Sequence, residues 1–259
     1  MSGVVLVERN DSVTRITLNR PGSYNALNME MFESLSSAIR DCFDDGSRVV
    51  VIRAEGKAFC SGGDLDYMIS QKSISDALAN LTKVFHRIVT DIRLLPKPVL
   101  AALNGTAAGG GVSLALACDL RIASERTRFK QAYTSSGLVP DGGWSLLVPA
   151  VIGLAKASEA VFLDEVLDAR QALELGLVTM VVPESEFEQK VEETAKKLKQ
   201  GATKAYAAAK TLLNQSMLPL LEIQLERERQ AITSIGKTKD AQEGLAAFLE
   251  KRRPTYSGK

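Results

Sequence analysis

Two glycine-rich segments are the features of this 259-residue chain whose residue types suggest chemistry. Residues 57–65 read KAFCSGGDL and residues 104–111 read NGTAAGGG, and each segment follows an apolar run typical of a buried strand. The second segment leads into a helix candidate at residues 112–118. Glycines that open a helix leave its first N–H groups unshielded, and the helix dipole favours negative charge there. Two such loops, each supplying one N–H, would form an oxyanion hole.

Glycine clusters also serve tight turns and close packing, and this simpler interpretation stays open at this point. Phosphate binding is the other alternative. The sequence has no GxxxxGK[ST] pattern, and no GxGxxG opens a helix within a nucleotide-type βαβ unit. We therefore do not expect a nucleoside triphosphate site.

The loops must be positioned by short strands that alternate with helices. Strand candidates cover residues 4–7, 13–18, 49–52, 99–103, 120–123 and 178–182, and helical stripes run over residues 31–42 and 81–95. This alternation predicts an α/β fold with parallel pairing. Helices are predicted at residues 187–199, 203–214 and 218–250. We expect an α/β core at residues 1–183 and a helical C-terminal region at residues 184–259.

The composition excludes several classes of protein. Lys and Arg total 32 against 31 Asp and Glu, a net charge of +1, which argues against nucleic acid as the main partner. No apolar stretch approaches the roughly 20 residues that span a bilayer, so no membrane association is expected. The N-terminus lacks a secretory signal, and three well-separated cysteines suggest reduced thiols rather than a metal site. We expect a cytoplasmic protein.

Taken together, motifs along nearly the whole chain resemble the crotonase superfamily, the enoyl-CoA hydratase/isomerase family. The matching blocks are NRP at residues 19–21 with NAL at 25–27, AFCSGGDL at 58–65, PVLAALNG at 98–105 with GGG at 109–111 and ACD at 117–119, GLVP at 137–140, ARQA at 169–172 with GLV at 176–178, and FLEKRRP at 248–254. The resemblance implies a spiral of ββα units. It also implies a C-terminal helical region that builds homo-trimers, commonly paired into hexamers.

The resemblance further implies an acyl-CoA thioester as the ligand. Coenzyme A would enter as part of the substrate, with no metal, flavin or nicotinamide. By motif position the oxyanion donors would be the N–H groups of Gly63 and Gly110. Residues implied to bind the substrate or coenzyme A are Ala26, Ser61, Gly63, Asp64, Leu65, Gly110, Tyr133, Phe248 and Lys251. Asp66 departs from the pattern, because hydratases often carry a lysine there.

The acid–base residues depart from the hydratase pattern more sharply. Hydratases of the family use two glutamates, and the matching positions here hold Ser113 and Tyr133. Neither is a carboxylate. Asp141 instead matches the aspartate of isomerase members, and a single carboxylate suits a 1,3-proton shift. We expect an isomerase, although an aspartate before two glycines is also a common turn residue or helix N-cap.

Three alternatives remain open beside a hydratase. In family members that cleave aryl-halide thioesters, an aspartate matching Asp141 acts as the nucleophile. A helix histidine, at the same distance before the PVLAA block as His86, works with it, and His86 is the only histidine of this chain. Those members carry a tryptophan at the position of Tyr133. A serine hydrolase is disfavoured because Ser113 lacks the final glycine of GxSxG. A non-catalytic acyl-CoA binder is the third.

Five apolar residues are expected to line the acyl pocket or core: Trp144, Leu146, Leu147, Val148 and Phe162.

Overall fold

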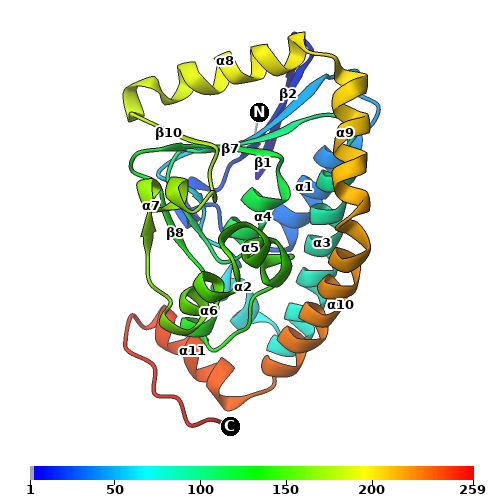
Figure 1. Ribbon diagram of the computed structural model, residues 1–259. Coiled ribbons are helices and arrows are strands. Elements are labelled where there is room, and N and C mark those ends of the chain that lie inside the picture. Colours follow the sequence, from blue (N-terminus) through cyan, green and yellow to red (C-terminus); the bar gives the residue numbers. More distant parts are fainter. Residues whose placement is uncertain (1–2) are drawn as a thin grey trace.

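A six-stranded sheet forms the centre of the computed structural model, which describes residues 3–259 (Figure 1). Its order is β1-β2-β3-β5-β7-β10, and only β1 and β2 pair antiparallel. The strands are β1 (Val5–Asn10), β2 (Val13–Leu18), β3 (Val49–Ala54), β5 (Val99–Leu103), β7 (Leu120–Ser124) and β10 (Met180–Val182). These are the six strands predicted from the sequence, and the α/β class is confirmed.

A second, four-stranded sheet consists of very short strands that the apolar pattern did not reveal. It contains β4 (Ala58–Cys60), β6 (Thr106–Ala108), β8 (Arg128–Lys130) and β9 (Leu167–Asp168), in that order. Strands β4, β6 and β8 follow β3, β5 and β7 directly in the chain, and helices follow each pair. The chain therefore repeats a strand–strand–helix unit, which confirms the expected ββα spiral.

Helices surround the two sheets. They are α1 (Met29–Asp41), α2 (Leu65–Ser70), α3 (Ile74–Leu94), α4 (Gly110–Ala117), α5 (Trp144–Ile152), α6 (Leu154–Leu163), α7 (Ala169–Glu174), α8 (Phe187–Gln200), α9 (Thr203–Gln215), α10 (Leu218–Ile235) and α11 (Lys239–Leu249). Short 3₁₀ turns lie at η1 (Pro21–Ser23), η2 (Thr134–Ser136) and η3 (Glu184–Glu186).

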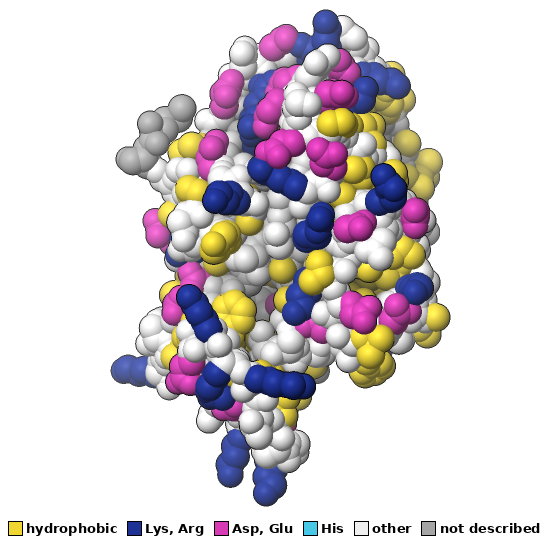
Figure 2. Space-filling model, turned by 90° about the vertical axis from the view of Figure 1, so that its left-hand side faces the viewer, with side chains coloured by type: hydrophobic (Ala, Val, Ile, Leu, Met, Phe, Trp, Pro, Cys, Tyr) yellow, Lys and Arg dark blue, Asp and Glu magenta, His cyan; other side chains and the backbone are white. Residues whose placement is uncertain are grey.

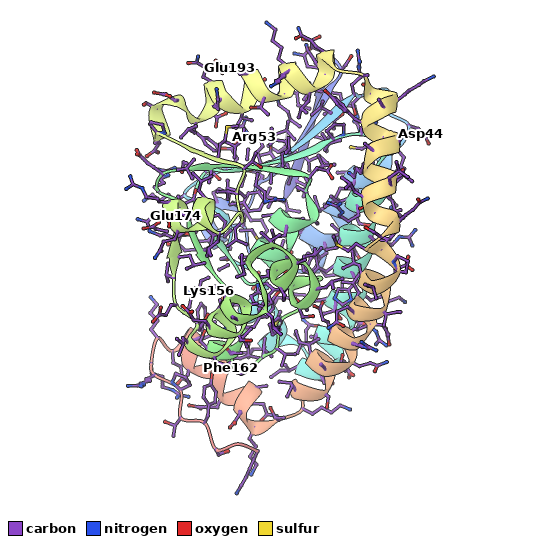
Figure 3. All side chains as sticks on the ribbon, viewed as in Figure 1. Asp44, Arg53, Lys156, Phe162, Glu174 and Glu193 are labelled. Atoms are coloured by element: carbon purple, nitrogen blue, oxygen red, sulfur yellow. The ribbon has the colours of Figure 1, made fainter. Side chains whose placement is uncertain are left out.

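Both faces of the large sheet are covered. In β3, Val50 and Ile52 belong to the main core, whereas Val49 and Val51 belong to a smaller cluster beneath α8. This division follows from the two-residue period of a strand, and burial on both faces explains the unbroken apolar run. Arg53, also on β3, lies under α8 and contacts Glu188 at 3.0 Å (Figure 3).

The C-terminal helices wrap around the rest of the chain (Figure 1). Helix α8 crosses the large sheet, α9 and α10 follow one another down one side, and α10 packs on α3. The prediction of one helix over residues 218–250 was wrong, because α10 ends at Ile235 and a separate helix, α11, begins at Lys239. Thr238 caps the new helix, with its Oγ1 accepting the N–H of Ala241 at 3.1 Å.

The surface mixes charges of both signs. Lys and Arg side chains lie among Asp and Glu side chains over one whole face of the molecule (Figure 2). Within residues 3–259, no helix is both long and apolar enough to cross a membrane.

Candidate active site

A cavity of about 970 Å³ opens between the two glycine-rich loops, α2, α3 and the C-terminal end of the chain. The ten residues predicted to be catalytic or to bind the substrate or coenzyme A all line this cavity: Ala26, Ser61, Gly63, Asp64, Leu65, Gly110, Tyr133, Asp141, Phe248 and Lys251. Segments more than 200 residues apart in the chain therefore meet at one site, as Ala26 and Phe248 show.

The backbone around Gly63 leaves its N–H free for a ligand. Leu27 pairs with the two neighbours of Gly63, since its N–H donates to the Gly62 carbonyl at 2.8 Å and its carbonyl accepts the Asp64 N–H at 3.1 Å. In extended backbone, successive N–H groups point to opposite sides. The N–H of Gly63 therefore points away from Leu27, and it has no protein acceptor among residues 3–259.

The amide of Gly110 is free for a different reason. Gly110 is the first residue of α4, and the first N–H groups of a helix have no partner within it. The two loops touch, because a Cβ added to Gly62 would lie only 3.4 Å from Gly110 N. Two unpaired amides thus converge on one cavity, beside the positive end of a helix.

Asp141 is a buried carboxylate of this cavity, with only 7% of its surface exposed, and unlike Asp64 it has no arginine partner within residues 3–259. The Tyr133 hydroxyl donates to its Oδ1 at 2.5 Å, and the Ser113 hydroxyl donates to its backbone carbonyl at 2.7 Å. Oδ2 has no hydrogen-bond partner within the described chain. The carboxylate is therefore oriented through one oxygen, while the other oxygen is free to accept a proton.

Burial sets the protonation of this group. It raises the pKa of Asp141 to about 7, the Tyr133 hydrogen bond works in the opposite direction, and the charge of Glu228 raises the pKa further. Burial and the neighbouring Asp141 carboxylate raise the pKa of Tyr133 well above its usual value, so its hydroxyl stays protonated. A base poised near neutrality is well suited to taking and returning a proton.

His86 lies next to Asp141 but outside the cavity lining. Its Nε2 accepts the Gly142 N–H at 3.3 Å, and burial, followed by the charge of Arg229, lowers its pKa to about 4. The imidazole is thus neutral at pH 7. The nitrogen that would activate a water is occupied by the backbone.

The apolar part of the cavity comes mostly from helices that gave no functional signal in the sequence. It is lined by Phe32, Met68, Leu78, Leu81, Phe85, Leu138 and Ile232. The expectation for Phe162 was wrong, because this residue lies on the outer side of α6 with 81% of its surface exposed (Figure 3). Trp144, Leu147 and Val148 are buried in the core rather than in the cavity wall, and Leu146 packs against that core.

The cavity rim carries charges of both signs. Arg20 bonds to Asp64 Oδ2 at 2.9 Å and to the Ala26 carbonyl at 2.6 Å, a pairing that the sequence analysis did not identify. Lys251 forms no salt bridge with the described residues, so its ammonium is available for an anionic ligand. No group of three or more His, Cys, Asp or Glu side chains that could hold a metal occurs in residues 3–259.

Comparisons with known proteins agree with this architecture. The enoyl-CoA hydratase/isomerase family model matches residues 8–259. The chain is 34% identical, over 98% of both chains, to a trans-2-decenoyl-[acyl-carrier-protein] isomerase of Streptococcus mutans, and 33% identical, over 100% of both, to a 1,2-epoxyphenylacetyl-CoA isomerase of Escherichia coli. The crystal structure of an enoyl-CoA hydratase from Mycobacterium avium subsp. paratuberculosis superposes with a TM-score of 0.91, at 36% identity over 98% of this chain and 99% of that one.

The ββα spiral and the paired free amides define a crotonase-fold protein. The chain belongs to the enoyl-CoA hydratase/isomerase family. It is an enzyme of that family, whose relatives include both isomerases and hydratases by name.

The contact between Tyr133 and Asp141 gives a prediction about titration. Because the tyrosine hydroxyl stabilises the anion, Tyr133→Phe should raise the pKa of Asp141 above its value of about 7. NMR titration of the carboxyl carbon in the free enzyme measures it. Ser113→Ala removes the hydrogen bond to the Asp141 backbone carbonyl but leaves the Tyr133 bond to Oδ1, so it should shift the pKa of Asp141 less. An unchanged or lower pKa in Tyr133→Phe would contradict the assignment.

Proposed function

We propose that the enzyme is an acyl-CoA isomerase that shifts a double bond by a proton shuttle on Asp141. The observation that carries this proposal is the pair of hydroxyl groups that bond to Asp141. Tyr133 and Ser113 occupy the two positions at which hydratases of the family carry glutamates. Each donates a hydrogen bond from its hydroxyl to Asp141. At these two positions the site therefore has hydroxyls instead of carboxylates: Tyr133 bonds the Asp141 carboxylate, and Ser113 bonds the Asp141 backbone carbonyl.

In this proposal Oδ2 of Asp141 removes a proton from one carbon of the acyl chain. The electron pair of the broken C–H bond enters a dienolate, whose negative charge rests on the thioester oxygen. The N–H groups of Gly63 and Gly110 stabilise that oxygen. Asp141 then returns the proton to the carbon two positions along the chain, so the double bond moves and the composition stays the same.

Hydration is less well supported, because adding water to an enoyl group needs one group to activate the water and another to protonate carbon. A nucleophilic role for Asp141 is also less well supported. The ester it would form needs a base to direct water, and His86 Nε2 accepts a backbone N–H instead. The names of the S. mutans and E. coli relatives, both isomerases, support isomerisation as the reaction class.

The ligand would span the whole cavity. Its acyl chain would lie against the apolar wall from α3 and α10, where Leu81, Phe85 and Ile232 face the cavity. The coenzyme A phosphates would lie toward Lys251 at the rim, with Ala26, Leu65 and Phe248 beside the thioester arm. Coenzyme A enters as part of the substrate, and no step in this mechanism uses a separate cofactor.

We also propose that the enzyme works as a homo-trimer or hexamer. The second half of the chain exposes large apolar side chains on two surfaces, one on α9 and α10 and one on α6 and its following loop. They are Leu212, Leu213, Leu220 and Ile223 on the first, and Leu154, Phe162, Leu163 and Val166 on the second. Large apolar side chains exposed together on neighbouring segments are typical of interfaces.

The proton shuttle predicts an isomerised product of unchanged mass. Incubation with 2-enoyl- and 3-enoyl-CoA thioesters, read by mass spectrometry and NMR, should show a moved double bond, and Asp141→Asn should lower turnover by ~10²-fold or more. Asp76→Asn, on the exposed first turn of α3, is the matched control. Gain of one water, or an acyl adduct on the intact protein, would refute the shuttle.

The oxyanion hole predicts a difference between two substitutions at one position. Gly110→Pro deletes the N–H at the first position of α4, where proline is tolerated, so turnover should fall by ~10²-fold or more. Gly110→Ala keeps the N–H, and its Cβ would meet side-chain carbons of Leu27 and Phe85 no closer than 3.4 Å. Equal activity of the two folded variants would remove Gly110 as a donor.

The assembly predicts a trimer or hexamer by sedimentation at micromolar concentration. Charge placed in an apolar interface is costly, so Leu213→Lys should shift the protein toward smaller species. A wild-type monomer under these conditions would overturn the proposal.

A further inference from the structure

Glu228 is a buried carboxylate outside the cavity. It lies on α10, only 4% of its surface is exposed, and it forms no salt bridge within residues 3–259. Buried carboxylates without a cationic partner are rare, because loss of hydration is costly unless hydrogen bonds replace it. Its three hydrogen-bond donors belong to one short segment, residues 143–145.

These contacts cap α5 from outside. Glu228 Oε2 accepts the Gly143 N–H at 2.7 Å, and Oε1 accepts the Ser145 N–H at 2.9 Å and the Ser145 hydroxyl. Gly143 is the N-cap position of α5 and has no side chain that could bind the free amides. A carboxylate from α10 therefore supplies the cap and the negative charge that the helix dipole favours.

The capped segment begins two residues after Asp141. Gly142 and Gly143 have φ angles of +68° and +82°, a region that glycine enters freely and leaves as freely. Because glycine can also adopt other backbone conformations, the Gly142–Gly143 segment, called the glycine hinge below, depends on outside contacts to hold one conformation. His86 binds the Gly142 N–H, Ser113 binds the Asp141 carbonyl, and Glu228 binds the next amide along.

Glu228 is also the charged group among the side chains that contact Asp141 or the two glycines after it. The groups that contact Asp141 or its glycines are the hydroxyls of Tyr133 and Ser113, the neutral imidazole of His86 and the Glu228 carboxylate. Arg229 and Glu226, whose charges act on the pKa of His86, pair with each other at 2.6 Å. Burial raises the pKa of Glu228, whereas its three donors favour the anion.

We propose that Glu228 is the positioning residue for Asp141: it fixes the glycine hinge that carries the catalytic carboxylate and keeps a negative charge beside it. This inference rests on the proposed function, in which Asp141 moves the proton. The hinge contact determines where Oδ2 lies relative to the acyl chain. The charge sets the pH at which Asp141 becomes an active base.

The test is the pH profile of kcat for Glu228→Gln. The amide keeps the size of the side chain, but it loses the charge and one acceptor. We expect kcat to fall by ~10-fold or more through misplacement of the base, with KM nearly unchanged. Without the neighbouring negative charge the pKa of Asp141 falls, so the acid limb of the profile should move to lower pH. Glu222→Gln, an exposed glutamate on the same helix, is the matched control.

Glu228→Asp and Ser145→Ala separate position from charge, and they serve as well if Glu228→Gln does not fold. Both keep the carboxylate charge and weaken the hinge contact, so kcat should fall several-fold while the acid limb stays near its wild-type pH. A role in stability alone would lower the melting temperature and leave the limb and kcat unchanged, which would overturn the inference. If Asp141→Asn is active, the proposed function itself fails; if it is inactive while all Glu228 and Ser145 variants match wild type, only this inference fails.

Discussion

The close approach of two backbone segments is the constraint on which the rest of the structure depends. Gly105 and Gly111 lie so near the strand of the other loop that an added Cβ would sit 2.0 Å from the Lys57 carbonyl oxygen and 2.2 Å from that of Cys60. No side chain fits at those distances. The close contact lets β4 and β6 pair, and that pairing sets the amides of Gly63 and Gly110 in one cavity wall.

A second constraint is the balance around Asp141 between burial and hydrogen bonding. Burial alone would keep the carboxyl protonated, and strong pairing with a cation would make it too weak a base. The structure uses neutral donors instead. The Tyr133 hydroxyl favours the anion without a full positive charge, and the neutral His86 leaves the local charge unchanged. The result is a carboxylate that can hold or release a proton near neutrality.

The sequence revealed those parts of the molecule that repeat a pattern or carry unusual residues. The six long strands were predictable because burial on both faces makes them continuous apolar runs. Strands β4, β6 and β8 have three residues each, too few to show a period. The break at Gly236 did leave a signal, glycine followed by the N-cap Thr238, and the apolar stripe on both sides of it masked the stop.

The same contrast holds within the site. The loop residues were found because glycines and a lone aspartate stand out against their surroundings, whereas Ile232 and Glu228 look like ordinary residues of an amphipathic helix. A glutamate on such a helix normally faces water, and only the fold shows that it shares the buried face with Leu221, Leu225 and Ile232. Arg20 was recognised as part of the NRP motif. Its pairing with Asp64 could not be predicted, because the two residues lie 44 positions apart in the chain and only the fold brings them together.

Helix α10 lies in the region that the sequence analysis assigned to assembly, and it also contacts the candidate site. Its buried face reaches the Asp141 hinge through Glu228 and the acyl wall through Ile232, while Leu220 and Ile223 remain exposed on the same helix. A partner subunit bound to those exposed residues would press on the element that caps α5. In the proposed assembly, helix α10 would therefore link the subunit interface to the Asp141 segment through the hydrogen bonds of Glu228 rather than through the cavity.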